Sequence, residues 1–231
     1  MSDNTLWDYH QKENRKHLVS GHPRQEILLK YIKKYLRKGS KIMEIGFGDG
    51  FLLNKLASSG FEVMGQDISG ENIQISKGLF GEKIDFLLGD TSGKILTKDE
   101  SLDGFIALEV LEHMDDAQLH ICISEINRVL KKGGLAFITV PAKENLKNYE
   151  CICPNCSEVF HRWGHKQCFD MPKLKNSFNK FGILVCKEFF IRHVGKNFIE
   201  NSIGWIMFFL RNILNFFIDI DNKSYLLIIK K

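Results

Sequence analysis

Short apolar runs alternate with helical patterns along the first third of the chain. Residues 42–45 predict a short buried strand, and residues 51–59 predict a helix that Gly60 ends. A second apolar strand over residues 61–64 leads to Asp67. A strand, a helix and a further strand in this order are typical of a βαβ unit, so the pattern predicts an α/β sheet.

The turn between the first strand and its helix contains three glycines, Gly46, Gly48 and Gly50. Glycine adopts backbone conformations that are closed to other residues and lets the main chain approach a ligand closely. Asp67, at the end of the second strand, supplies two acceptors for the two hydroxyls of a ribose. We therefore expect an adenosine-containing cofactor at the carboxyl ends of these strands.

The spacing of the glycines indicates which cofactor is expected. A dinucleotide-binding turn reads G-x-G-x-x-G, but here the third glycine comes one residue early, at Gly50, and Phe51 fills its usual place. Glu44 precedes the turn and Asp49 lies within it. Carboxylates are poor neighbours for a pyrophosphate and suitable neighbours for a cationic ligand. The turn resembles the first motif of the class I S-adenosylmethionine-dependent methyltransferases, an acid followed by G-x-G-x-G.

The resemblance continues in order along the chain. Residues 83–90 are an apolar strand that ends in Asp90 and is followed by Thr91, where this family places its contacts to the adenine. Residues 102–114 are similar to the fourth-strand signature, and residues 109–113 match its E-V-L-E-H run. Several motifs in the right order and spacing are far more specific than a single glycine turn.

The rest of the expected sheet follows the same family pattern. A helix begins at Asp115, which forms a capping box with Gln118, and residues 135–140 are the fifth strand. Residues 183–191 and 225–229 are the antiparallel pair that ends the sheet. The resemblance implies a Rossmann-like, seven-stranded α/β sheet with helices on both faces.

The chain is expected to form one domain. Residues 1–22 are polar and are expected to be a flexible arm or a lid, and residues 23–231 form a single methyltransferase domain. Residues 22–37 predict a helix that leads into the first strand. Two insertions are expected, one rich in cysteine and histidine at residues 145–170 and one helical at residues 196–220.

The resemblance also implies a role for each residue around the cofactor. The backbone of the glycine turn holds the methionine end, Glu44 orients its ammonium group, and Asp67 binds the ribose. Asp90 and Thr91 contact the adenine, and the residues after the fourth strand border the methyl group. The residues expected to bind S-adenosylmethionine are Glu44, Gly46, Phe47, Gly48, Gly50, Asp67, Ile68, Asp90, Thr91, Leu108 and Glu109.

The cysteine and histidine insertion predicts a zinc site. Cys153 and Cys156 form a C-x2-C knuckle, and His161 and His165 follow at H-x3-H spacing, so these four residues can close a tetrahedral site. Two further cysteines of the insertion are spare ligands, and an incidental set of cysteines and loop histidines is the other interpretation. The pattern C-P-x-C followed by F-H-R-x-G-H resembles an insertion of bacterial methyltransferases linked to surface-polysaccharide or lipid metabolism. The spare cysteines are Cys151 and Cys168.

The same insertion supplies a candidate general base, because a neutral imidazole can accept the proton of an acceptor hydroxyl. His161 is a catalytic candidate if cysteines alone bind the metal. His113, at the end of the fourth strand, is the second candidate, and a structural role in capping the loop is its alternative.

Residues 197–218 predict an amphipathic helix with a wide apolar face. Its polar residues interrupt an apolar run that is too short to span a membrane. Three roles stay open: packing on the sheet or at a homodimer contact, a lid over a bulky apolar acceptor, or peripheral contact with the inner membrane face.

Composition narrows the class of protein. The chain has 231 residues, 44% hydrophobic and 26% charged, which is typical of a soluble globular protein. Its net charge of +4 is too small to imply a nucleic-acid partner, and the basic residues of 22–37 are expected to be a solvated helix face. Without a signal-peptide pattern at the N-terminus, we expect a cytoplasmic protein with reduced or metal-bound cysteines.

Together these patterns predict methyl transfer from S-adenosylmethionine to an oxygen, or less readily a nitrogen or carbon, of a small molecule or lipid-linked sugar. A catalytically silent module that binds S-adenosylmethionine and an RNA methyltransferase are the alternatives. A nucleotide-dependent oxidoreductase or other nucleotide-dependent transferase is disfavoured by the missing third dinucleotide glycine.

Overall fold

The structure is a computed structural model that describes residues 7–9, 12, 22–190 and 223–231. Most of the expected arm at residues 1–22 lies outside the described residues, as does the expected helical insertion at residues 196–220. No helix in the described ranges is long and apolar enough to cross a membrane.

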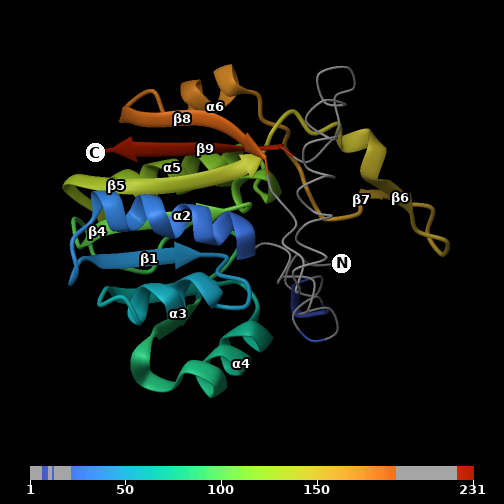
Figure 1. Cartoon of the computed structure of the whole chain (residues 1–231). Helices are drawn as coiled ribbons and strands as arrows, with labels where there is room; N and C mark the ends of the chain where they lie inside the picture. Colours follow the sequence, from blue (N-terminus) through green and yellow to red (C-terminus); the bar gives the residue numbers. More distant parts are fainter. Residues whose placement is uncertain (1–6, 10–11, 13–21, 191–222) are drawn as a thin grey trace, which may run out of the picture.

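A seven-stranded sheet forms the centre of the molecule, with the strand order β3-β2-β1-β4-β5-β9-β8 (Figure 1). The first five strands pair in parallel, and β9 is antiparallel to both β5 and β8. This confirms the expected Rossmann-like sheet with its antiparallel end. Its strands are β1 (Lys41–Ile45), β2 (Glu62–Asp67), β3 (Asp85–Leu88), β4 (Leu102–Leu108), β5 (Leu130–Pro141), β8 (Gly182–Phe190) and β9 (Lys223–Lys230).

Helices cover both faces of the sheet. Side chains alternate along each strand, so Ile42 of β1 packs on one face and Met43 on the other. One face is covered by α2 (His22–Tyr35), α3 (Phe51–Ala57) and α4 (Gly70–Phe80), and the opposite face by α5 (Asp116–Val129) and α6 (Met171–Ser177). The described chain also has three short 3-10 helices, η2 (Gly81–Lys83), η3 (Leu111–His113) and η4 (Leu146–Tyr149), and helical residues at 7–9 and 12.

A small hairpin outside the main sheet was not expected from the pattern. It consists of β6 (Glu150–Ile152) and β7 (Val159–His161), which pair antiparallel and project from the domain (Figure 1). Two backbone contacts hold the chain after it against the end of β4, because Lys166 and Gln167 both donate their N–H to the carbonyl of Glu112 (2.7 and 3.0 Å). The cysteine and histidine insertion is therefore anchored beside the carboxyl end of the sheet.

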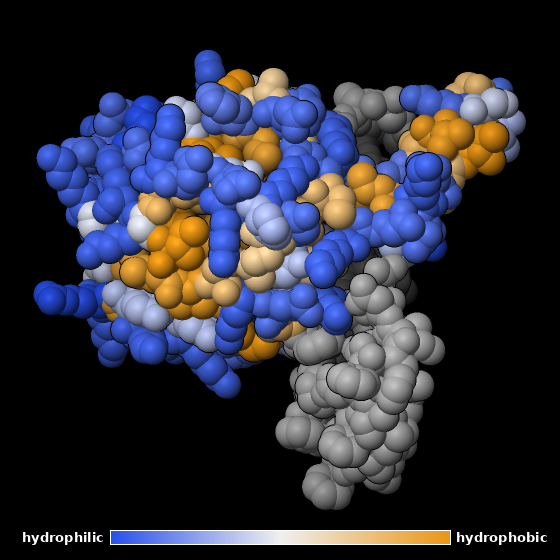
Figure 2. Space-filling view, turned by 90° about the horizontal axis from the view of Figure 1, so that it is seen from above, coloured by the Kyte–Doolittle hydropathy of each residue, from blue (hydrophilic) through white to orange (hydrophobic). Residues whose placement is uncertain are grey.

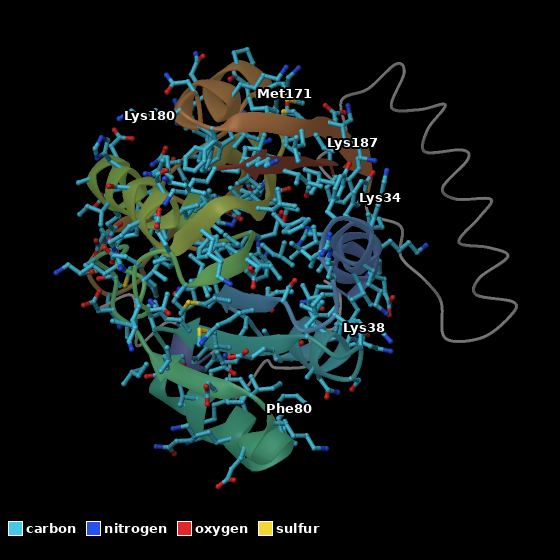
Figure 3. The ribbon with its side chains drawn as sticks, turned by 90° about the vertical axis from the view of Figure 1, so that its left-hand side faces the viewer. Lys34, Lys38, Phe80, Met171, Lys180 and Lys187 are labelled. Atoms are coloured by element: carbon cyan, nitrogen blue, oxygen red, sulfur yellow. The ribbon has the colours of Figure 1, made fainter. Side chains whose placement is uncertain are left out.

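The basic residues of the first helix lie on the surface, as expected. Lys34 of α2 and Lys38, which follows the end of this helix, point away from the sheet (Figure 3). The buried side of the same helix consists of Leu28, Leu29 and Ile32. The helix therefore presents an ordinary solvated face.

The expected capping box at the start of α5 is confirmed. The carboxylate of Asp115 accepts from the N–H of Gln118 (2.8 Å), and the Gln118 side chain accepts from the N–H of Asp115 (2.7 Å). Gln118 also donates to the carbonyl of Thr91 (2.6 Å), so the cap links α5 to the loop after β3.

We expect Asp115→Ala to lower the free energy of unfolding by about 1 kcal/mol, because the first turn of α5 loses its side-chain acceptor. Thermal unfolding should show a melting temperature lower by about 2–4 °C. Asp116→Ala is the control, because Asp116 is exposed in the same turn and is not the capping residue. Equal losses in the two variants would contradict the assigned role of the cap.

Candidate functional site

The glycine turn after β1 has the backbone that its sequence predicts. Gly46, Gly48 and Gly50 have φ angles of 60°, 58° and 76°, which side chains rarely tolerate. A Cβ on Gly46 would lie 2.6 Å from Cγ2 of Val110, and one on Gly50 would lie 2.6 Å from the ring of Phe80. The turn is thus packed directly against the E-V-L-E-H segment that follows β4.

Three carboxylates surround this turn. Glu44 is 1% exposed, and its Oε2 has no hydrogen-bond partner among the described residues. Burial raises the pKa of Glu44 well above its usual value, and the charges of Asp49 and Asp67 raise this pKa further. A buried carboxylate costs free energy unless a donor or cation satisfies it, so the turn is electrostatically suited to a cationic ligand.

Asp67 lies at the carboxyl end of β2, as expected for a ribose ligand. Its carboxylate accepts from the N–H of Ser69 (2.9 Å) and from the side-chain amide of Asn72 (2.8 Å). Burial raises the pKa of Asp67, although these two hydrogen bonds oppose the shift. The contacts fix the orientation of the carboxylate at the edge of the sheet.

The other expected cofactor residues fall into two groups. Asp90 and Thr91 are exposed beyond β3, and the hydrogen bonds from Ser92 lower the pKa of Asp90. Ile68 is half-buried after β2, and Leu108 is half-buried at the end of β4.

The side chain of Phe47 lies in the core, and its expected contact with the cofactor is through the backbone of the turn. Its ring is 1% exposed and packs on Phe86 with a centroid distance of 5.0 Å. A ring at Phe47 fills the core beneath β2, because Gly65 leaves room for it there. Only the backbone of Phe47 therefore borders the turn.

Residues of α2 and the N-terminal segment also reach the site. His22 lies 2.6 Å from a carboxylate oxygen of Asp49 and stacks on Phe51. Asp8 accepts from the hydroxyl of Ser69 (2.5 Å), and Trp7 contacts the ring of His113 edge-on (4.9 Å between centroids). The sequence did not predict these contacts, because each contact joins residues that are far apart in the chain.

Glu109 is held in a left-handed backbone conformation, with a φ of 54°. Its N–H donates to the carbonyl of Thr139 (2.9 Å), and one carboxylate oxygen pairs with Arg24 of α2 (3.2 Å). Glu109 thus joins the end of β4 to the first helix at the mouth of the site.

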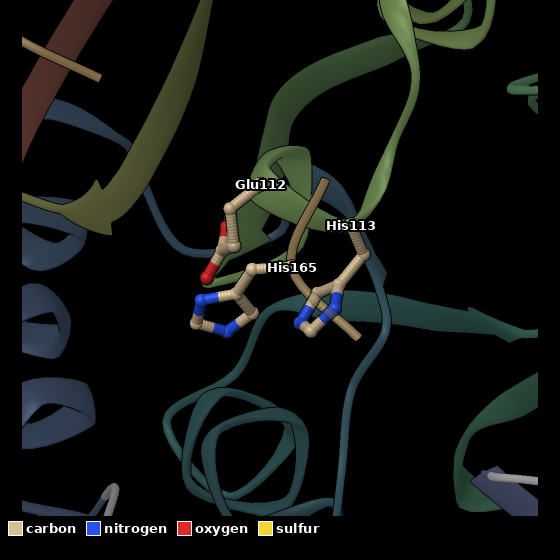
Figure 4. Close-up of side chains that lie close together, drawn as sticks. All are labelled: Glu112, His113 and His165. Atoms are coloured by element: carbon tan, nitrogen blue, oxygen red, sulfur yellow. The ribbon is translucent and has the colours of Figure 1, made fainter. Parts of the chain in front are cut away.

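A second cluster of titratable side chains lies directly beyond it. One potential ligand atom from each of Glu112, His113 and His165 lies within 4.8 Å of the others, so the three could hold a metal ion (Figure 4). Glu112 is 1% exposed, and within the described part of the chain neither of its carboxylate oxygens has a hydrogen-bond partner. Burial raises the pKa of Glu112 well above its usual value, and the charge of Glu109 adds to the shift.

The hydrogen bond of His113 fixes its tautomer. Nδ1 lies 3.3 Å from the carbonyl oxygen of Gly164, which can only accept, so Nδ1 carries the proton and Nε2 keeps a lone pair. Burial lowers the pKa of His113 to about 3, and the neighbouring His165 contributes to the shift. His113 is therefore a weak proton acceptor, which disfavours the expected role as general base and leaves a neutral nitrogen ligand.

Nδ1 donates a hydrogen bond in His165 and accepts hydrogen bonds in His161. Nδ1 of His165 lies 2.5 Å from the carboxylate of Glu144, so this nitrogen donates and Nε2 keeps its lone pair. Nδ1 of His161 instead accepts from the backbone N–H of Trp163 (3.3 Å) and of His165 (3.0 Å). In neutral His161 the proton is therefore on Nε2. This atom has no hydrogen-bond acceptor among the residues described and lies 3.9 Å from Glu144.

Two consequences follow for the expected roles of His161. Glu144, His161 and His165 are close enough to share an ion, but Nε2 of His161 has no lone pair to offer. The same proton prevents Nε2 from acting as a general base. His161 is better suited to donate a hydrogen bond and to support its stacked neighbour His165, with 4.6 Å between the rings.

The four expected zinc ligands do not come together. In the described ranges, the close groups of three or more potential ligands contain His161 and His165 but neither Cys153 nor Cys156. The hairpin explains the separation: His161 pairs with Glu150 at its base, whereas the cysteines lie in the turn at its tip. Along the strand, the three steps from Glu158 to His161 span about 10 Å.

A cavity of about 200 Å³ lies beside His165 and Glu144. Arg24 and Glu109 line one side, Glu144 and His165 line another, and Tyr149 and Trp163 add aromatic surface. A larger open groove of about 920 Å³ runs along β3. Neither lining includes a residue of the glycine turn, but Glu109, which lines the smaller cavity, directly follows the carboxyl end of β4. Ligands of open α/β sheets bind at the carboxyl ends of the strands, so the smaller cavity is the candidate acceptor site.

Comparison with known proteins agrees with this arrangement. Residues 43–138 match the protein family described as methyltransferase domain. The ubiquinone biosynthesis O-methyltransferase of Pelagibacter ubique is 32% identical over 115 residues, which are 48% of this chain and 46% of that relative. The chain thus spans about half the length of the curated relatives it matches.

Solved structures are similar over nearly the whole chain. An S-adenosylmethionine-dependent methyltransferase from Mesorhizobium loti has a TM-score of 0.64 at 13% identity and covers 92% of this chain and 98% of its own. One from Methanosarcina mazei has a TM-score of 0.62 at 20% identity, with 87% and 96% covered. The chain therefore has the class I methyltransferase fold, with a sequence match to the methyltransferase domain over residues 43–138.

Proposed function

We propose that this protein transfers a methyl group from S-adenosylmethionine to a hydroxyl oxygen of a small molecule. The observation that carries the proposal is the left-handed glycine turn enclosed by Glu44, Asp49 and Asp67. S-adenosylmethionine carries a sulfonium and an ammonium group, so it can satisfy carboxylates that would repel a pyrophosphate. The cofactor supplies the reactive methyl group, and the protein supplies binding, orientation and exclusion of water.

The acceptor would occupy the cavity between Arg24, Glu109 and His165. This cavity is close to the cofactor turn, because Gly46 packs on Val110 and Val110 directly follows Glu109. Relatives named ubiquinone biosynthesis O-methyltransferase are similar over about half of this chain, which supports an oxygen acceptor on a small molecule. A lipid-linked acceptor, membrane contact or homodimer formed through residues 197–218 depends on residues outside the described ranges.

For a metal ion we propose a set of ligands that differs from the one expected from the sequence. We infer that a divalent cation binds to the carboxylate of Glu112 and to Nε2 of His113 and His165. Each imidazole has its other nitrogen engaged, by the carbonyl of Gly164 and by Glu144, which is the usual outer support of histidine ligands. One carboxylate and two imidazoles leave coordination positions open for a substrate oxygen.

A bound cation would lower the pKa of an acceptor hydroxyl that it contacts. The residues of the chain then have separate tasks. Glu112 would offset one of the two charges of the ion, Glu144 holds His165 in the correct tautomer, and the buried N–H of His161 faces Glu144 at the edge of the cluster. The hydroxyl oxygen would face the methyl group close to Val110, whose side chain packs on the glycine turn.

We expect Asp67→Ala to weaken binding of S-adenosylhomocysteine by about 2 kcal/mol, or roughly 30-fold in Kd, because charge-assisted hydrogen bonds to the ribose are lost. Isothermal titration calorimetry measures the change directly. Asp85→Ala is the matched control, because Asp85 is an exposed acid at the start of β3. Unchanged affinity in the Asp67 variant would show that another group binds the ribose.

Glu44→Gln should have opposite effects on stability and on binding. Without cofactor at neutral pH, the variant should be more stable by about 1–3 kcal/mol, because it replaces a buried carboxylate whose Oε2 has no hydrogen-bond partner in the described structure by a neutral amide. Its affinity for S-adenosylmethionine should fall, because the ammonium group loses its counter-charge.

The sign of the pH dependence follows from the raised pKa of Glu44. The folded chain binds the proton more tightly than the unfolded chain, whose Glu has its ordinary value of 4.5. The contribution of protonated Glu44 to the free energy of unfolding of the wild-type chain is therefore fully present below pH 4.5 and is lost as the pH rises. The stabilisation by Glu44→Gln should be largest at neutral pH and vanish near pH 4 in urea unfolding. A destabilised variant at neutral pH would contradict an unsatisfied carboxylate at this position.

Metal binding can be tested with Mn²⁺, which thiolates bind poorly and which can be followed by electron paramagnetic resonance. His165→Ala and Glu112→Gln should abolish binding, and Glu144→Gln should weaken it about 10- to 100-fold as an outer support. His161→Ala should retain the ion, because the proton on Nε2 excludes it as a ligand. Equal losses in His161→Ala and His165→Ala, or no Mn²⁺ binding by the wild-type protein, would contradict this cation site.

A further inference from the structure

The turn of the β6–β7 hairpin brings two cysteines together at the tip of a projecting element (Figure 1). The N–H of Cys153 donates to the carbonyl of Glu158 (2.8 Å), and the N–H of Ser157 donates to the carbonyl of Cys153 (2.9 Å). These bonds close the turn around Pro154, Asn155 and Cys156. Ser157 has a φ of 59°, so the chain reverses there in a conformation that side chains rarely adopt.

The sulfur of Cys153 is surrounded by hydrogen-bond donors. The backbone N–H groups of Cys156 and Asn155 point at it, and the thiol of Cys156 forms a hydrogen bond with it. These donors lower the pKa of Cys153, and the thiolate is the form of cysteine that binds metals. The turn therefore holds two sulfur ligands side by side, with backbone N–H groups directed at the sulfur of Cys153.

The two sulfurs are only half of a zinc site. Structural zinc is almost always held by four ligands in a tetrahedron. Over the ranges that the structure describes, neither Cys153 nor Cys156 belongs to a close group of three or more cysteine, histidine or acidic ligands. The histidines expected to complete the site lie at the base of the hairpin, where His165 is paired with Glu144.

Apolar side chains are exposed around the same tip, where Figure 2 shows hydrophobic surface on the projecting hairpin. Ile152 and Val159, the pair next to the turn, are 65% and 59% exposed. Phe160, the next residue along β7, is 48% exposed. Large apolar residues gathered on a protruding element are typical of a surface that another protein covers.

We propose that two copies of this chain join hairpin to hairpin through one zinc ion bound by Cys153 and Cys156 of each copy. A second copy supplies the two missing ligands, because a two-fold axis through the ion brings together identical half-sites. Zinc remains divalent, and thiol protons are released to solvent as thiolate bonds to zinc form. The apposed tips would also cover Ile152 and Val159 of both copies.

The experiment uses the full-length chain, kept reduced and freed of metal by chelation. Its mass is measured by native mass spectrometry and light scattering before and after Zn²⁺ is added. We expect a monomer that becomes a dimer with one bridging zinc ion for two chains. Co²⁺ should produce the same dimer with a sulfur-to-metal charge-transfer band.

Cys153→Ser and Cys156→Ser, alone and combined, should abolish both the dimer and the charge-transfer band. Cys151→Ser is the matched control and should dimerise normally, because Cys151 lies in β6 opposite Phe160 rather than in the turn. Unchanged binding of S-adenosylhomocysteine would show that each variant is folded, and the test does not depend on methyl transfer.

Several outcomes would overturn the proposal. A monomer that keeps one cysteine-bound zinc ion would mean that ligands of the same chain complete the site. A dimer that survives in the doubly substituted chain would mean that another surface joins the copies. Zinc bound only at Glu112, His113 and His165 would leave the mass monomeric and the charge-transfer band absent.

Discussion

Folding of the sheet takes the carboxyl groups of Glu44 and Glu112 out of water, and in the described structure one oxygen of Glu44 and both oxygens of Glu112 have no hydrogen-bond partner. A buried carboxylate of this kind is costly, and the raised pKa of each group records that cost. Hydrophobic residues at both positions would make a more stable domain. The glycine turn and the histidine cluster lie at these two positions, and in the proposed function a cationic cofactor and a metal ion would compensate the two carboxylates.

The parallel sheet brings the two carboxylates to the same edge. β1 and β4 are neighbours, with Glu44 opposite Ile106, and both strands end where the glycine turn packs on Val110. The proposed cofactor site thus lies at the end of β1 and the proposed metal site just beyond the end of β4. The 3-10 turn of η3 separates them, because it carries Glu112 and His113 away from the cofactor turn toward the insertion. This separation leaves room for an acceptor between a cationic cofactor and a bound ion.

The sequence allowed prediction of the sheet and of most of the cofactor turn because their signals are local. Strand periodicity, the glycine spacing and the capping box of Asp115 each involve residues within a few positions of one another. The environment of His165 could not be predicted in this way. Its partner Glu144 is 21 residues away, and its neighbour Glu112 precedes it by α5, β5, η4 and the β6–β7 hairpin. The unpredicted hairpin also moved Cys153 away from the histidines that its sequence spacing suggested as partners.

The two histidines of the H-x3-H pattern show why spacing alone cannot assign chemistry. Both rings lie in the same cluster, stacked with 19° between their planes. Backbone N–H groups only two and four residues away occupy Nδ1 of His161 and place its proton on Nε2. A carboxylate from a different segment occupies Nδ1 of His165 and leaves the lone pair on Nε2. What contacts Nδ1 therefore decides that one imidazole donates a hydrogen bond and the other can bind a metal or accept a proton.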